Sequence, residues 1–138
     1  MKYFYVNQSY ISIGSNKNNA HHYIIDALSI IKKNKFFLIQ KISNTYYTQP
    51  ADYMFQSKFI NIICKFYTFL SVKQILNFFQ YIEKKNKKKF MKEKYFSRSL
   101  DIDILFFNKK KLYDNQKIFL PHIRMFKRSF IKKILLNT

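Results

Sequence analysis

The chain has 138 residues, a formal net charge of +19, one cysteine and one glycine. This length suits one domain with a modest core, so we expect residues 1–138 to form a single domain. The lone cysteine, Cys64, excludes an intramolecular disulfide and a cysteine-based zinc cluster. The lone glycine, Gly14, excludes the glycine-rich phosphate loops of the Walker and dinucleotide-binding motifs. Any bound phosphate must therefore meet side chains or a metal ion.

The basic charge favours an anionic partner, such as a nucleotide phosphate or a nucleic acid. The chain is also rich in Lys, Asn, Ile, Phe and Tyr, whose codons are rich in A and T, so genome composition is an alternative source of the charge. Arginine is rare by comparison, and its fixed fork of donors suits anions better than lysine does. The three arginines are Arg98, Arg124 and Arg128.

No run of about 18 apolar residues occurs in the chain, and its first residues lack the apolar core of a signal peptide. We therefore expect no membrane span and a cytoplasmic location.

The first third of the chain predicts a strand, a helix and a second strand. Residues 10–13 alternate in polarity and lead to a turn signal at residues 14–16. Apolar residues then recur at helical spacing over residues 20–31. A second strand is predicted over residues 36–43. The helix has asparagines at both ends, with Asn18 or Asn19 as the cap and Asn34 near the end.

The middle of the chain predicts a loop over residues 44–56 and a third strand over residues 59–67, which are aromatic and β-branched. A second helix then starts at a capping box formed by Ser71 and Gln74, with a hydrophobic staple between Leu70 and Ile75. Its apolar stripe comprises Val72, Ile75, Leu76, Phe79 and Ile82.

After this helix we expect a basic loop over residues 84–94, a fourth strand over 100–107, a hairpin or short ribbon over 109–119 and a terminal helix over 125–136. The basic loop is either an arm that closes over a polyphosphate or a solvated charge run. The element order β-α-β-β-α-β predicts an α+β, ferredoxin-like fold, in which helices pack on an antiparallel sheet.

Two of the seven carboxylates in the chain, Asp101 and Asp103, lie two residues apart in the fourth predicted strand. Residues i and i+2 of a strand share a face, so these carboxylates should lie side by side, while Leu100, Ile102 and Ile104 face a core. Such a pair repels itself unless a divalent cation or a cationic partner is near, which favours a metal site for phosphoryl transfer. A wet strand face beside surface lysines is the alternative.

Two further polar residues are candidates for a site. Asn61 lies in a strand among aromatic residues, where its amide needs a partner from the backbone or a ligand. His122 follows a proline at a predicted turn, and either a structural or a catalytic role fits it.

Several short motifs make the chain resemble the 6-hydroxymethyl-7,8-dihydropterin pyrophosphokinase family from about Tyr10 to Leu135. The motifs are Ile13-Gly14-Ser15-Asn16, Tyr47-Thr48-Gln49-Pro50, Phe59-Ile60-Asn61, Arg98-Ser99-Leu100-Asp101-Ile102-Asp103, Pro121-His122-Ile123-Arg124-Met125 and Arg128-Ser129-Phe130. They occur in the family's order and at nearly its spacing.

The resemblance implies an enzyme that moves the pyrophosphoryl group of ATP to the hydroxymethyl oxygen of the pterin and releases AMP. It implies two magnesium ions on Asp101 and Asp103, and catalytic roles for Lys88, Arg98 and His122. The residues that correspond to the family's ATP contacts are Gln80, Glu83, Lys88, Arg98, Ile104, Lys117, His122 and Arg128. Those that correspond to its pterin contacts are Thr48, Phe59, Asn61, Tyr95 and Phe130.

Other functions remain open at the level of sequence. A ferredoxin-like sheet with aromatic residues and a basic loop can bind single-stranded nucleic acid, although the aspartate pair would repel a phosphate backbone, so we expect no nucleic-acid partner. A relic of the kinase that binds ATP without turnover is a second alternative. We expect a monomer that binds ATP and the pterin.

Overall fold

The structure, a computed structural model, describes residues 5–16, 19–48, 59–91 and 100–108. For residues 48, 59 and 87–91 it describes the main chain only. The elements are β1 (Asn7–Ser15), α1 (Ala20–Lys33), β2 (Phe37–Ile42), β3 (Tyr46–Thr48), β4 (Phe59–Thr68), α2 (Val72–Met91) and β5 (Asp101–Phe107).

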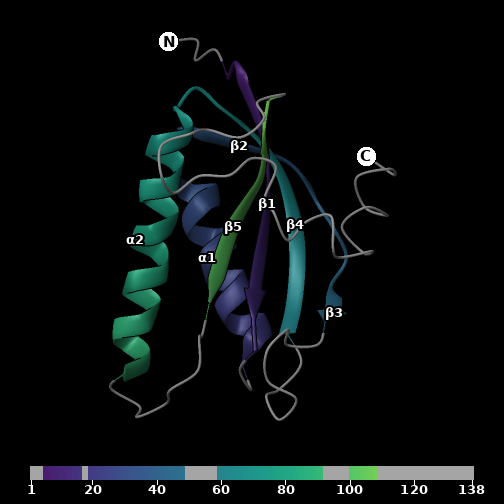
Figure 1. The fold of residues 1–138 in the computed structure, drawn as a ribbon, viewed down its shortest axis with the longest axis vertical. Helices are drawn as coiled ribbons and strands as arrows, with labels where there is room; N and C mark the ends of the chain where they lie inside the picture. The colour runs from purple at the N-terminus through teal and green to yellow at the C-terminus, as the bar shows by residue number, and fades with distance from the viewer. Residues whose placement is uncertain (1–4, 17–18, 49–58, 92–99, 109–138) are drawn as a thin grey trace.

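The strands form one antiparallel sheet in the order β2-β4-β1-β5, and β3 pairs with the beginning of β4. Figure 1 shows α1 and α2 on the same side of this sheet. The helix α1 connects β1 to β2, and α2 connects β4 to β5, so each helix crosses over one intervening strand. This is the ferredoxin-like arrangement that the element order predicts.

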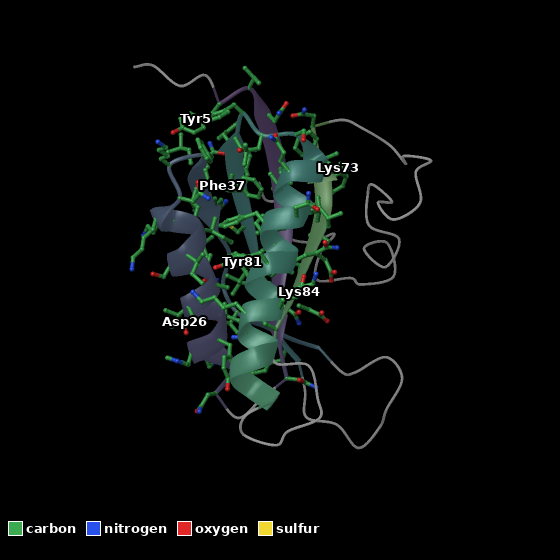
Figure 2. All side chains as sticks on the ribbon, turned by 90° about the vertical axis from the view of Figure 1, so that its left-hand side faces the viewer. Tyr5, Asp26, Phe37, Lys73, Tyr81 and Lys84 are labelled. Carbon is green, nitrogen blue, oxygen red and sulfur yellow. The ribbon has the colours of Figure 1, made fainter. Side chains whose placement is uncertain are left out.

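The main core lies between the sheet and the two helices. Phe66 of β4, Phe79 of α2 and Ile31 of α1 are fully buried there, and Figure 2 shows Phe37 on the helix side of the sheet. A smaller cluster on the opposite face consists of Ile63 and Leu105, with tyrosine and phenylalanine rings packed around them. The helix side of the sheet is therefore committed to the main core, and the opposite face carries the smaller cluster.

The second helix begins as the sequence predicts. The Ser71 main-chain N–H donates to Gln74 Oε1 at 2.9 Å, and the Gln74 N–H donates to Ser71 Oγ at 3.2 Å. The capping box is thus formed in both directions. At the start of α1, by contrast, Asn19 occupies the cap position without a capping hydrogen bond from its side chain.

Several predicted boundaries were wrong, among them the start of the first strand, which lies at Asn7 and not at residue 10. The predicted loop over 44–56 contains the short strand β3, because Tyr46, Tyr47 and Thr48 pair with β4. The predicted basic loop over 84–94 is helical through Met91, since lysine is a good helix former and neither glycine nor proline interrupts the segment. The turn signal at 14–16 starts too early, because Gly14 and Ser15 still belong to β1.

The predicted hairpin over 109–119 and terminal helix over 125–136 lie outside the described residues. Within the described part of the chain, neither helix combines the length and apolarity that a membrane crossing needs.

Candidate functional site

The candidate site lies at one end of the sheet, on the face opposite the helices. There β1 reaches its last residues while β4 and β5 begin, because both strands run antiparallel to β1. The helix α2 ends at this same, lower end of Figure 1. The topology therefore brings segments that are far apart in the chain together on one small area; Ser12 and Asp103, for example, are direct cross-strand partners.

Two rows of residues cross the sheet at this end. In the first row Gly14 pairs with Asn61 of β4 on one side and with Asp101 of β5 on the other. In the second row Ser12 lies in the same way between Ile63 and Asp103. Neighbouring strands are about 4.8 Å apart, so the main chains of Asn61 and Asp101 are roughly 10 Å apart, with β1 between them.

Asp101 and Asp103 lie on the same face of β5, as predicted. The side chains of both are half-buried, whereas Ile102 and Ile104 between and beyond them are buried in the main core. Their Cα atoms are about 6–7 Å apart at the usual strand rise. The pair therefore presents carboxylate oxygens together at the start of the strand.

The donor set of this pair fits magnesium. Mg²⁺ prefers oxygen ligands and keeps several waters, so in phosphoryl-transfer sites one or two carboxylates and the substrate phosphates hold it. Among the described residues no group of three or more His, Cys, Asp or Glu side chains lies together, as a closed protein cage would need. Asp101 and Asp103 would supply the protein carboxylates of such a magnesium site.

Asn61 leans over the neighbouring strand at Gly14. The Asn61 side chain is 3 % exposed, and a Cβ atom added at Gly14 would overlap its Oδ1 and lie 3.4 Å from its Cγ. No described glycine has a positive φ, so the backbone at Gly14 is extended rather than turned. The missing side chain at Gly14 therefore leaves room over β1 for the buried Asn61 amide.

The helix α2 carries the predicted ATP contacts Gln80 and Glu83 in its middle and Lys88 near its end. Gln80 is exposed and Glu83 is half-buried, and their three-residue spacing places them on one side of the helix. Lys88 lies in the last two turns of the same helix. The basic residues from 84 to 91 are thus held by a helix that extends to the end of the sheet where the aspartates lie.

Ile104 is a different case. Its side chain is 5 % exposed, belongs to the main core and pairs with Ile11 on the helix side of the sheet. A contact between Ile104 and ATP would therefore involve its main chain.

Cys64 also faces this core, and burial raises the pKa of its thiol to about 12.

The remaining predicted site residues are not placed. Thr48 and Phe59 are cross-strand partners next to the Asn61 row, but only their main chain is described. The other six lie outside the described residues: Tyr95, Arg98, Lys117, His122, Arg128 and Phe130.

Two residues of this face were missed as site residues in the sequence. Gly14 was interpreted as part of a turn, and Ser12 as an ordinary strand residue. Both share a face with the aspartates and Asn61, which the two-residue period of a longer β1 would have indicated.

Comparison with known proteins gives a consistent picture. The model of the 7,8-dihydro-6-hydroxymethylpterin-pyrophosphokinase family matches residues 10–138. The chain is 29 % identical over 125 residues to the 2-amino-4-hydroxy-6-hydroxymethyldihydropteridine pyrophosphokinase of Bacillus subtilis. It is 28 % identical over 123 residues to the protein of that name in Haemophilus influenzae, and 34 % identical over 128 residues to the folic acid synthesis protein fol1 of Pneumocystis carinii.

These matches cover 91 %, 89 % and 93 % of this chain, respectively. They cover 74 % of the Bacillus protein and 76 % of the Haemophilus protein, but 17 % of the much longer Pneumocystis protein. The residues of the candidate site, including Asp101 and Asp103, all lie within residues 10–138, the range that the family model matches.

Proposed function

This chain belongs to the 7,8-dihydro-6-hydroxymethylpterin-pyrophosphokinase family, and we propose that it carries out the family's reaction with magnesium bound by Asp101 and Asp103. That reaction is the transfer of pyrophosphate from ATP to hydroxymethyldihydropterin in folate biosynthesis. The observation that carries the proposal is the row Asn61–Gly14–Asp101. The row contains the buried amide of Asn61, which suits the polar edge of a heterocycle. It also contains Asp101, which together with Asp103 forms a carboxylate pair suited to a metal–phosphate complex.

The carboxylates supply the negative charge that holds magnesium, and we propose two ions. When bound, magnesium neutralises the triphosphate and the charge that develops on the transferred group. Two carboxylates of one strand can hold the same metal–phosphate complex only if they lie on the same face of that strand. Asp101 and Asp103 share one face of β5.

ATP would be bound at the α2 side of this area. We propose contacts from Gln80 and Glu83, a phosphate contact from Lys88, and a main-chain contact from Ile104. Arg98 and His122 would stabilise phosphate charge during transfer, because cationic donors aimed at the transferred group lower the barrier. Lys117 and Arg128 complete this proposed set.

The pterin would be bound at the β4 side. An amide such as that of Asn61 both donates and accepts hydrogen bonds, which matches the mixed polar edge of a pterin. We propose that Thr48 supports this edge, while Phe59, Tyr95 and Phe130 supply aromatic surface for the flat ring. The hydroxymethyl oxygen would then point along the row towards Asp101.

The decisive experiment mixes the purified chain with ATP, magnesium and 6-hydroxymethyl-7,8-dihydropterin and follows AMP. AMP formation that needs both the pterin and magnesium is expected. Binding of the pterin beside an ATP analogue without AMP would instead indicate a relic whose site is intact. Absence of both turnover and ligand binding in the folded protein would overturn the proposal.

We further propose that the chain forms one domain, acts as a monomer and works in the cytoplasm. The main core, which the sheet shares with both helices, supports one domain for the described residues. Light scattering coupled to gel filtration tests the monomer, and a mass of twice 16.9 kDa would contradict it.

A further inference from the structure

We propose that Gly14 is a positioning residue for substrate binding: the absence of a side chain at this position is what allows the Asn61 amide to lie over β1, between β4 and Asp101. This inference rests on the proposed function, because it takes the Asn61 amide to be a binding group for the pterin. It adds a residue that makes its contribution through another side chain and not by touching the reacting atoms.

The steric basis is a single crowded contact. A Cβ at Gly14 would overlap Asn61 Oδ1, and the next nearest atoms would be Asn61 Cγ at 3.4 Å and the Ile60 carbonyl oxygen at 3.5 Å. The Cγ and carbonyl contacts are ordinary for a packed methyl group. Only the amide oxygen of Asn61 must move when position 14 gains a side chain.

The amide cannot move freely. Asn61 is 3 % exposed, and its strand is paired on both sides at this row, with Gly14 of β1 and with Tyr46 of β3. Rotation away from Gly14 would turn the amide from the strand that carries Asp101. A methyl group at position 14 would therefore displace the amide that this row offers to a heterocycle.

The backbone conformation of Gly14 indicates that the requirement for glycine at this position is steric. Gly14 has no positive φ, and it lies inside β1 with cross-strand partners on both sides. An alanine can adopt this extended conformation without strain. A generic requirement for glycine flexibility is therefore excluded at this position, and the Asn61 contact remains as the cost of the substitution.

A double-mutant cycle over Gly14→Ala and Asn61→Ala tests the inference. Binding of 6-hydroxymethylpterin is measured by fluorescence in the presence of magnesium and a non-hydrolysable ATP analogue. We expect Gly14→Ala to weaken pterin binding at least tenfold and the ATP analogue less than twofold. The double variant should bind the pterin no more weakly than Asn61→Ala alone, because the clash is gone once the amide has been removed.

Ile13→Val is the matched control, since Ile13 directly precedes Gly14 in β1 and faces the main core. It should lower thermal stability without weakening pterin binding more than twofold. If Gly14→Ala fails to fold but the double variant folds, the steric contact is supported directly. If neither folds, Gly14 has a backbone role and the inference is overturned.

Two other outcomes also overturn it: pterin affinity of Gly14→Ala within twofold of the unmodified chain, or multiplicative losses in the double variant. Failure of the proposed function is distinguishable from these. It would be seen as absent pterin binding by the unmodified chain, whereas the coupling between Gly14 and Asn61 in thermal unfolding would still report the steric contact.

Discussion

At the scale of single residues, the aspartate pair makes the sharpest prediction. Replacing Asp101 or Asp103 by Asn keeps the shape of the side chain and removes its charge, so the proposed metal–phosphate complex would lose a ligand. We expect kcat/KM to fall by about a hundredfold or more, since metal stabilisation of the transition state is worth several kcal/mol. Steady-state AMP formation measures this loss, and circular dichroism checks the fold.

Asp26→Asn is the control for this experiment. Asp26 is an exposed carboxylate on α1, 3.6 Å from His22 Nε2, on the helix side of the sheet. Its removal should leave turnover within twofold. Near-normal turnover in Asp101→Asn or Asp103→Asn would contradict the metal assignment.

A buried hydroxyl gives a prediction about stability. Thr68 is fully buried, donates from Oγ1 to the Phe36 carbonyl at 2.6 Å and accepts from the Leu70 N–H at 3.2 Å. Thr68→Val leaves both backbone groups without this partner. We expect a loss of about 1–3 kcal/mol in the free energy of unfolding, measured in urea. Thr45→Val, at a half-exposed position, should change it by less than about 0.5 kcal/mol.

The buried thiol predicts a pH dependence. Burial raises the pKa of Cys64 from 9.0 to about 12, so the unfolded chain loses this proton first as pH rises. The contribution of Cys64 to stability is therefore complete below about pH 9 and declines towards pH 12. At pH 8 we expect iodoacetamide to label Cys64 slowly in the native chain and rapidly in urea; equal rates would contradict its burial.

At the scale of elements, the start of α2 is a local device whose effect can be isolated. The reciprocal bonds between Ser71 and Gln74 satisfy two main-chain N–H groups at the helix start. Ser71→Ala should cost about 1 kcal/mol of stability. The same change at Ser29, inside α1, should cost less or stabilise, because alanine is the better helix former. Equal losses at both sites would show that capping contributes nothing.

Elements with a strong local signal were predictable from sequence. The α2 start is fixed by four neighbouring residues, and the alternation around Asp101 and Asp103 places both carboxylates on one face. The end of α2 was not predictable by the same means. A lysine-rich segment fits a solvated loop and a helix equally well by charge, and only propensity favours the helix that is found.

The site was predictable in its residues and not in its arrangement. The carboxylate pair is visible in the sequence, but the position of Gly14 between Asn61 and Asp101 depends on strand order and register. Pairing over such sequence separations is a tertiary property, and a one-residue shift of β1 would place Gly14 on the other face. This is why the single glycine was taken for part of a turn.

At the scale of the whole molecule, the charge of +19 dominates. Like charges on a compact chain repel one another and destabilise it, and salt screens the repulsion over about 10 Å at 0.1 M and about 3 Å at 1 M. The pyrophosphokinase reaction accounts for basic residues near the triphosphate. It does not require the exposed lysines elsewhere on α2, such as Lys73 in its first turn.

Replacing Lys73, Lys84 and Lys85 together by Gln should therefore stabilise the chain at low salt. All three are exposed on α2, and none lies in its last turn, where a cation would favour the negative end of the helix dipole. Lys73, in the first turn, faces the positive end. We expect a higher midpoint of thermal unfolding than that of the unmodified chain in 20 mM NaCl, and a difference that shrinks in 0.5 M NaCl. An equal difference at both salt concentrations would mean that helix propensity or packing, and not charge repulsion, is responsible. A lower midpoint at low salt would mean that these lysines form stabilising ion pairs, so that the excess charge is tolerated by pairing and not by screening alone.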